Sequence, residues 1–310
     1  MAGTFFIMIA CLTWALDTLI RYPLLNAGYS TLQIVLLEHI TLFLITLPLL
    51  IKHKAEFKRL SRLGFVSLFF IGGIGSAVGT LAFTQAFQYL NPTVVILLQK
   101  LQPLVAILAA SWLLKEQIRK HFAFWALVIL AGSLTMMWTD IAKLSSANLH
   151  YSDLSNDIVM GYGYTLLAVF AWGMATVCGK YLSQTGMSAN AIMSGRFTTG
   201  LLVLATLGVL NQEQITTITT GDLSSLVLMA LLSGLVGMWF YYQGLKRVPA
   251  QAATLAEMTF PVFAALINWW ALDISLNEYQ IIGACLLLIG NVEIRRHELS
   301  QPVDSELQSA

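Results

Sequence analysis

Four ionisable side chains lie in the middle of long apolar stretches of the sequence: Glu38, Lys100, Arg196 and Glu257. A charge far from water is costly and is usually retained for a task such as binding a solute or a proton. The four formal charges sum to zero, so they could all be paired. Inert ion pairs that only set helix register are the alternative interpretation. We expect these residues to belong to a binding site.

One of the four lies within a wider polar stripe. Gln251, Thr254, Glu257 and Pro261 recur at intervals of three and four residues, so they share one side of a helix. Pro261 lacks a backbone N–H and frees a carbonyl near Glu257, which a wet cavity would tolerate. A kinked packing helix is the alternative. The stripe favours a polar cavity in this segment.

Two glutamines and two tryptophans extend the candidate site. Indole rings stack on flat or cationic groups, and glutamine amides bind polar ones. Tryptophans near the ends of apolar helices are also typical anchors at a membrane surface, so both interpretations stay open for Trp14 and Trp172. The predicted substrate-binding residues are Trp14, Glu38, Gln85, Lys100, Trp172, Arg196, Gln243 and Glu257.

Catalytic and metal-binding motifs are missing from the sequence. Gly173 to Tyr181 resembles a phosphate-binding loop, but five residues separate its glycines and Tyr181 replaces the hydroxyl that binds magnesium. The three cysteines lie in apolar stretches without metal-ligand spacing. We therefore predict a protein that is not an enzyme and has no metal site and no cofactor.

The composition places these residues in a membrane. Of 310 residues, 57% are hydrophobic and 11% are charged, against about 25% charged in soluble domains. Such a chain has too few charges to cover a water-facing surface. The net charge of +1 gives no basic excess for nucleic acid. The first apolar run lacks a preceding Lys or Arg and a cleavage pattern, so we interpret it as a span rather than a signal peptide.

Ten stretches approach the length needed to cross a bilayer. A helix of about 20 apolar residues spans the hydrocarbon core. The predicted spans are 3–20, 31–51, 64–87, 92–114, 121–139, 160–182, 188–210, 223–246, 250–272 and 278–294. With the N-terminus inside, 13 of the 17 Lys and Arg residues fall inside and only Arg21 and Lys143 fall outside. Because cytoplasmic loops are rich in these residues, we expect both termini in the cytoplasm.

The sequence repeats itself with a constant shift of 158 residues. Matching pairs include Trp14 and Trp172, Ser30 and Ser188, Gly79 and Gly237, and Pro103 and Pro261. An odd number of spans in each half inverts the second half relative to the first, as in many secondary transporters. We predict an all-α polytopic membrane protein with ten transmembrane helices in two inverted five-helix repeats, 1–139 and 160–294. An external polar linker (140–159) joins the repeats, and a cytoplasmic tail (295–310) follows them.

These features together resemble the EamA type of the drug/metabolite transporter superfamily, over about residues 3–294. The resemblance rests on Trp-Ala or Trp-Gly in the first span of each half, a charged residue in the second, a proline in the fourth, and Lys115-Glu116. Two features depart from the family pattern. Glu38 stands where members commonly have arginine, and Asp273-Ile274-Ser275 replaces the acidic closure in the second half.

The resemblance implies a secondary carrier in the bacterial inner membrane that moves a small organic metabolite by alternating access. Export of an amino acid or a related amphipathic compound follows family practice, with multidrug efflux or nucleotide-sugar exchange as alternatives. The rival class is a non-transporting membrane scaffold or an intramembrane enzyme. The expected partners are a small-molecule substrate and the bilayer. Without a nucleotide-binding loop, concentrative transport would need an ion gradient, and proton coupling through Glu38 and Glu257 is one possibility.

Further expectations concern contacts. Glu38 and Arg196 hold equivalent positions in the two halves, and so nearly do Lys100 and Glu257, so the opposite charges of each pair could meet near the repeat axis. We expect Lys100 and Glu257 to face a common cavity. Asp17 and Arg21 lie four residues apart, which predicts a local ion pair at the outer surface. Small residues in the third and eighth spans predict close helix packing. We expect His39 to be packed rather than catalytic.

Overall fold

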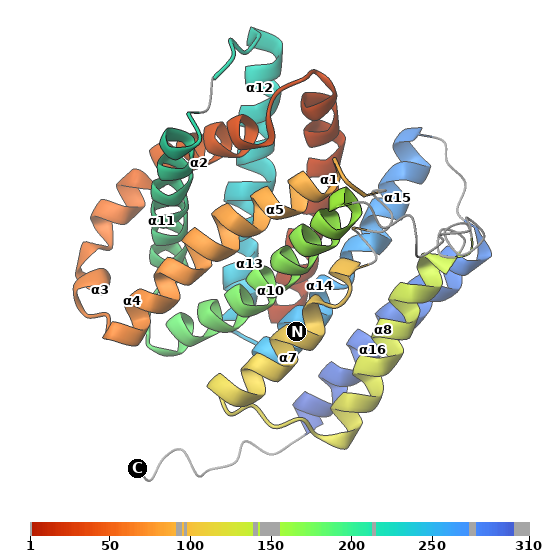
Figure 1. The fold of residues 1–310 in the computed structure, drawn as a ribbon. Coiled ribbons are helices and arrows are strands. Elements are labelled where there is room, and N and C mark those ends of the chain that lie inside the picture. The colour runs from red at the N-terminus through yellow and green to blue at the C-terminus, as the bar shows by residue number, and fades with distance from the viewer. Residues whose placement is uncertain are drawn as a thin grey trace.

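The computed structural model describes residues 2–90, 95, 98–138, 142, 156–212, 215–272 and 277–300, and in these residues every regular element is helical (Figure 1). Five helices are long and continuous: α1 (Ala2–Asn26), α2 (Thr31–Lys52), α10 (Asn156–Gln184), α11 (Ala189–Leu210) and α16 (Glu278–Ser300). Ser30 and Ser188 cap α2 and α11 by accepting hydrogen bonds from Gln33 N and Ala191 N. The two caps lie 158 residues apart, in agreement with the repeat.

Two helical runs contain a wide π-helical segment at matching positions. The first run consists of α4 (Arg62–Phe69), η1 (Phe70–Val78) and α5 (Gly79–Ala86). The second consists of α12 (Thr220–Met229), η3 (Ala230–Gly237) and α13 (Met238–Leu245). π-Helical turns are rare in proteins, and those that do occur are often found at functional sites. Because such a segment recurs in both halves, the middle of each run is a candidate region for a functional site.

The small residues of these runs bring neighbouring helices close together, as predicted. A methyl group at Gly72 would overlap the Arg196 carbonyl and the Thr199 hydroxyl of α11. At Gly237 it would overlap the Thr13 hydroxyl of α1. Gly75 likewise lies against Ala175 of α10. The absence of a Cβ therefore sets the spacing between the π-helical segments and their neighbours.

The segments that contain the repeated prolines are interrupted. Helix α14 (Ala250–Glu257) ends at Glu257, and α15 (Phe260–Leu272) begins again with Pro261 in its first turn. Helix α7 (Gln102–Leu113) likewise begins with Pro103 next to its first residue. Proline fits the start of a helix because its missing N–H would have no partner there. The breaks place Glu257 and Lys100 at helix ends.

Six helical runs are long and apolar enough to cross a membrane: 3–25, 31–52, 62–86, 157–184, 189–210 and 220–245. Helices α7 and α8 (Lys120–Met136) are shorter apolar helices. The predicted spans 92–114, 121–139, 250–272 and 278–294 do not meet the same criterion in the described residues. The proline breaks shorten two of these helices, and charged residues at the end of α16 lower the hydropathy of another. Residues 139–141, 143–155, 273–276 and 301–310, which include most of the predicted linker (140–159) and part of the predicted tail (295–310), lie outside the described residues.

The helices form one main bundle and a flanking pair. Helix α1 packs on α13, η3 and α15, and α10 packs on α5, η1 and α7, so elements of the two predicted halves interleave. Helices α8 and α16 lie side by side (Figure 1), with Gly132 and Gly283 against each other's backbones. Small residues thus allow close approach here too.

Exposed basic side chains gather in the loops at one end of the bundle, which we call the basic face. It includes Lys52, Arg59, Lys120, Lys246 and Arg247, all exposed, where α2 ends, α8 begins and α13 ends. Helix α1 also starts there, because Gly3 lies against Arg247 and Val248. The basic face provides a fixed reference for the two ends of the site.

Two carboxylates join the halves on the basic face. Glu116 accepts hydrogen bonds from Ala250 N (2.8 Å) and Gln251 N (3.1 Å), which cap α14. Glu56, in the short helix α3 (Lys54–Lys58), accepts from Ser188 N (2.7 Å) at the start of α11. Partial burial raises the pKa of Glu56, but the hydrogen bonds from Ser188 and His53 outweigh it and hold the pKa below its ordinary value.

Candidate functional site

A cavity of about 280 Å³ lies inside the main bundle. Residues of both predicted halves line it, from helices that include α1, α2, α5, α10, α11 and α13. Six of the eight predicted substrate-binding residues are among them: Trp14, Glu38, Lys100, Trp172, Arg196 and Glu257. A cavity of this size with polar groups on an aromatic wall is typical of a small-molecule site.

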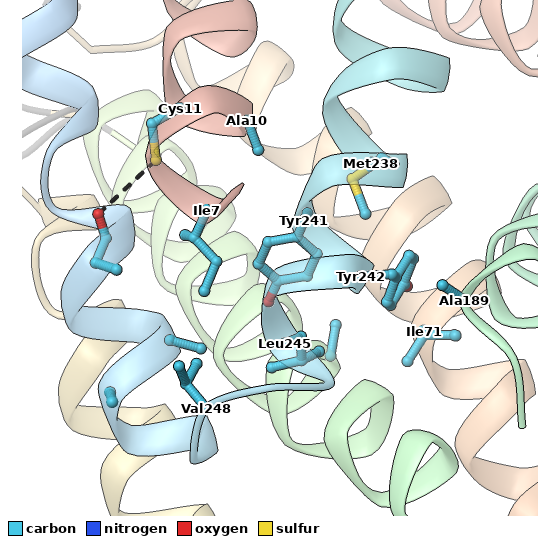
Figure 2. Packing of buried hydrophobic residues seen from close by; sticks show 14 of the residues in the cluster. Ile7, Ala10, Cys11, Ile71, Ala189, Met238, Tyr241, Tyr242, Leu245 and Val248 are labelled. Carbon is cyan, nitrogen blue, oxygen red and sulfur yellow. Dashed lines mark hydrogen bonds between the residues drawn. The ribbon is translucent and has the colours of Figure 1, made fainter. Parts of the chain in front are cut away.

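A packed apolar cluster separates the cavity from the basic face. Figure 2 shows Ile7 and Cys11 of α1 beside Tyr241, Tyr242 and Leu245 of α13, with Val248 below Ile7, and these residues belong to one apolar cluster. Each of these side chains is at most 9% exposed. On α1, the lining residues begin at Trp14 and continue to Leu25, away from the basic face. In this conformation the cavity is closed toward the basic face.

Two aromatic pairs repeat across the cavity. The rings of Trp14 and Tyr241 lie 5.5 Å apart, and those of Trp172 and Phe83 lie 5.0 Å apart, both in tilted arrangements. In each pair the first ring comes from one half and the second from the other. The tryptophans are separated by 158 residues, and so are Phe83 and Tyr241. The pairs therefore reproduce the sequence repeat as a contact between halves, and the Tyr241 hydroxyl is the chemical difference between them.

One wall carries a network centred on Arg21. The Arg21 guanidinium donates to Asp17 (2.8 and 3.2 Å) and to Glu38 (3.0 Å), and so joins α1 to α2. Ser233 of η3 donates to Asp17 (2.6 Å). The network contains two carboxylates and one cation, so its formal charge is −1. It ties helices of the first half to the π-helical segment of the second.

Glu257 is held by neutral donors. Its carboxylate accepts hydrogen bonds from Tyr241 (3.0 Å), Thr176 (3.4 Å) and Gln102 (2.8 Å). These donors come from α13, α10 and α7, so one carboxylate at the end of α14 connects four helices. Among the described residues, no cation lies within 4.0 Å of it. Such a carboxylate is placed to exchange a proton or to meet a ligand.

Of the three cations that line the cavity, Lys100 and Arg196 lack a carboxylate partner within 4.0 Å in the part of the chain that the structure describes. Lys100 is 4% exposed, and its Nζ lies 5.6 Å from the centre of the Phe260 ring. Arg196 donates to the Tyr242 hydroxyl at 3.3 Å. These two residues give the cavity cationic groups that are not neutralised in place.

Lys100 and Glu257 face one cavity, as expected, although no ion pair joins them in the described part of the chain. Two other predictions about contacts are wrong. Glu38 pairs with Arg21 rather than with Arg196, because Arg21 reaches it from the neighbouring helix α1. The Asp17–Arg21 pair is not at the outer surface: Asp17 is 8% exposed, and both residues line the cavity.

Gln85 and Gln243 lie outside the cavity. Gln85 donates to Gln88 at 2.9 Å, and Gln243 accepts from Arg247 at 2.9 Å, both near helix ends. His39 is 2% exposed and contacts Ser76 and the Val35 carbonyl, so it is packed as expected while it also lines the cavity.

The sequence interpretation missed several polar lining residues: Asp17, Arg21, Gln102, Thr176 and Ser233. The aspartate and the arginine lie inside one apolar run, which could have identified them. The other three are ordinary polar residues, and only the packing of the helices reveals them. Among the described residues, no group of three or more His, Cys, Asp or Glu side chains is placed to hold a metal ion.

Comparison with known proteins identifies the relatives of this chain. The EamA-like transporter family matches residues 1–138 and 159–294. The riboflavin transporter ImpX of Fusobacterium nucleatum is 28% identical and aligns over 95% of this chain and 97% of its own length. The LicB protein of Haemophilus influenzae is 24% identical, over 94% and 96%. A crystal structure at 16% identity has a TM-score of 0.71, covering 96% of this chain and 99% of that one.

Proposed function

Because the chain belongs to the EamA-like transporter family, we propose that it is a secondary carrier that moves a small ring-containing metabolite through the central cavity by alternating access. The protein is a multi-pass membrane transporter and not an enzyme. Its substrate, the direction of transport and the coupling ion are the proposed parts. The observation that best supports this proposal is the cavity, which both halves line with paired aromatic rings and buried charges.

Riboflavin is the first substrate to test. The rings of Trp14 and Trp172 belong to opposite halves, and aromatic side chains stack on flat rings. The 28% identity to a riboflavin transporter, over nearly the full length of both chains, points to the same class. A rigid, flat solute with polar edges suits a cavity that combines aromatic and charged residues.

Amino acids and related amphipathic metabolites are the second candidate. The observation that favours them is that one cavity holds a carboxylate, Glu257, and a guanidinium, Arg196, neither of which has an ion-pair partner among the described residues. A zwitterion offers an ammonium group to the first and a carboxylate to the second. Export of such compounds is the prediction made from sequence, and the same assay tests it.

The proposed topology has ten spans with the basic face in the cytoplasm. Helices α7, α8, α14 with α15, and α16 add four spans to the six long ones. The positive-inside rule supports this orientation. In that orientation, the packed cluster closes the cytoplasmic end of the cavity in this conformation. Inverted halves that exchange conformations would open the cavity to the other side.

The proposed coupling uses Glu257. Its carboxylate is bonded only to neutral donors, so protonation would not break an ion pair. Opening of the bundle would separate the four helices that meet at this carboxylate and change its access to water. A proton bound on one side could then be released on the other.

A direct test is uptake by purified protein in proteoliposomes. Radiolabelled riboflavin and a panel of amino acids are supplied with and without pH and voltage gradients, in both orientations of the substrate gradient. We expect saturable riboflavin transport that Trp14→Leu and Trp172→Leu reduce at least about tenfold, because each removes one stacking surface. Trp112→Leu is the matched control, since Trp112 is 79% exposed and far from the cavity lining. Amino-acid transport without riboflavin transport would select the second candidate.

A further inference from the structure

Among the described residues, the buried polar atoms of the cavity lining that have no hydrogen-bond partner are mainly donors. Three buried polar atoms of lining residues have no hydrogen-bond partner among the described residues: Arg21 Nη1, Arg196 Nε and Thr84 Oγ1. Guanidinium nitrogens only donate, and a hydroxyl can donate. Buried polar groups in native structures are usually paired, so orphaned donors around a cavity indicate a missing acceptor.

The two guanidinium groups differ in how far their other contacts already satisfy them. Arg21 is committed to Asp17 and Glu38 through three hydrogen bonds. In the described part of the chain, the Arg196 guanidinium donates one hydrogen bond, to the neutral Tyr242 hydroxyl at 3.3 Å, and has no carboxylate within 4.0 Å. Arg196 is therefore the cation best able to bind an acceptor group directly.

The backbone around Arg196 is held in place. The Arg196 carbonyl lies against Gly72 of η1, at a distance that excludes even a methyl group. Its neighbour Phe197 is 2% exposed, and Ser194 is fully buried. The π-helical segment thus fixes the height at which the guanidinium enters the cavity. Such preorganisation favours selective binding over loose electrostatic attraction.

We propose that Arg196, assisted by Arg21, is the specificity-determining residue of the cavity and selects ring compounds that present a carbonyl or carboxylate acceptor at their edge. The proposal rests on the proposed carrier function and names the substrate chemistry of the same site. A site built to hydrogen-bond a polar group rejects analogues that lack it, because its own donors then stay unpaired. The substrate ring would stack on Trp14 and Trp172, and Arg196 would donate a hydrogen bond to the acceptor group at the edge of the ring.

The test measures binding of matched probe pairs to the purified full-length chain by isothermal titration calorimetry. Lumichrome, a tricyclic ring with two carbonyl groups, is paired with phenazine, a tricycle that has none. Indole-3-acetate is paired with 3-methylindole. We expect the acceptor-bearing member to bind about tenfold more tightly, as for an otherwise unpaired charged donor, and Arg196→Met to reduce this ratio to about one.

Two further variants separate specificity from folding. Tyr242→Phe removes the hydrogen bond that the Arg196 guanidinium makes within the described residues and keeps the guanidinium, so it should retain the discrimination. Arg62→Met removes an exposed arginine outside the cavity lining and should match the wild type. A ratio that survives in Arg196→Met, or equal binding within both pairs, overturns the proposal, as does a failure of both acceptor-bearing probes to bind. If indole-3-acetate binds but no flavin is bound or transported, the result supports Arg196 as the acceptor-binding residue. The same result would exclude riboflavin as the substrate.

Discussion

Single side chains make the two halves of the cavity chemically different. Phe83 and Tyr241 hold equivalent places beside the two tryptophans, but only Tyr241 carries a hydroxyl, and it donates to Glu257. Glu38 and Arg196 are likewise equivalent in sequence and opposite in charge. A repeated backbone thus carries an asymmetric set of charges, as a site for an asymmetric substrate requires.

At the residue scale, the absence of an ion pair between Lys100 and Glu257 has a measurable consequence. The free-energy changes of Lys100→Met and Glu257→Gln should add in the double variant to within about 0.5 kcal/mol, as for residues without a direct interaction. Denaturant unfolding in detergent measures all three changes. A coupling of several kcal/mol would show that the two charges meet directly.

Glu56 predicts a pH dependence of stability. Its folded-state pKa is lowered by hydrogen bonds that outweigh partial burial, so the ionised carboxylate stabilises the fold above the unfolded pKa of about 4.3. The contribution disappears as pH falls through the folded pKa. Glu56→Gln should therefore lower the melting temperature at pH 7, and the gap to the wild type should close toward pH 3. An equal gap at both pH values would contradict this assignment.

At the scale of elements, glycine positions set how closely the π-helical segments approach their neighbours. Gly72→Ala should destabilise the fold by about 1–3 kcal/mol, because the new methyl group must displace α11 at Arg196 and Thr199. The melting temperature in detergent measures the effect. Gly163→Ala is the matched control, since no atom lies within 4 Å of the added methyl group in α10. This variant should be neutral or stabilising by up to about 1 kcal/mol.

For the whole molecule, charge predicts orientation. Reporter fusions at Arg59, Lys120 and Lys246, all on the basic face, should report the cytoplasm, because basic loops stay inside. A fusion after Leu210, at the opposite end of α11, should report the outside. The reporters compared are alkaline phosphatase and a cytoplasmic fluorescent protein. A split among the three basic-face fusions would exclude the proposed ten-span topology.

Energy coupling is also a property of the whole molecule. If Glu257 carries the proton, a protonophore should abolish accumulation of substrate in proteoliposomes. Glu257→Gln should abolish accumulation and spare exchange down the substrate gradient. The amide oxygen can still accept from Tyr241 and Thr176, and Gln102 can turn its own amide oxygen toward the new N–H, but the amide cannot bind a proton at this pH. Accumulation by the variant that equals the wild type would exclude coupling through Glu257.

The membrane class, the family and most of the cavity-lining charges could be predicted from the amino-acid sequence alone. Sparse charge forces apolar helices into lipid, and a constant shift of 158 residues relates the halves. Glu38, Lys100, Arg196 and Glu257 were identifiable because a buried charge in an apolar run is costly, and all four line the cavity.

Which of these charges contact each other depends on the tertiary structure and could not be predicted from the sequence. Partners depend on how helices pack and rotate, and equivalence in a repeat does not fix the distance between two side chains. Arg21 from α1 therefore takes Glu38, while neutral donors from three helices surround Glu257. Gln85 and Gln243 illustrate the same limit, since their places near helix ends turn them toward nearby loops and away from the cavity.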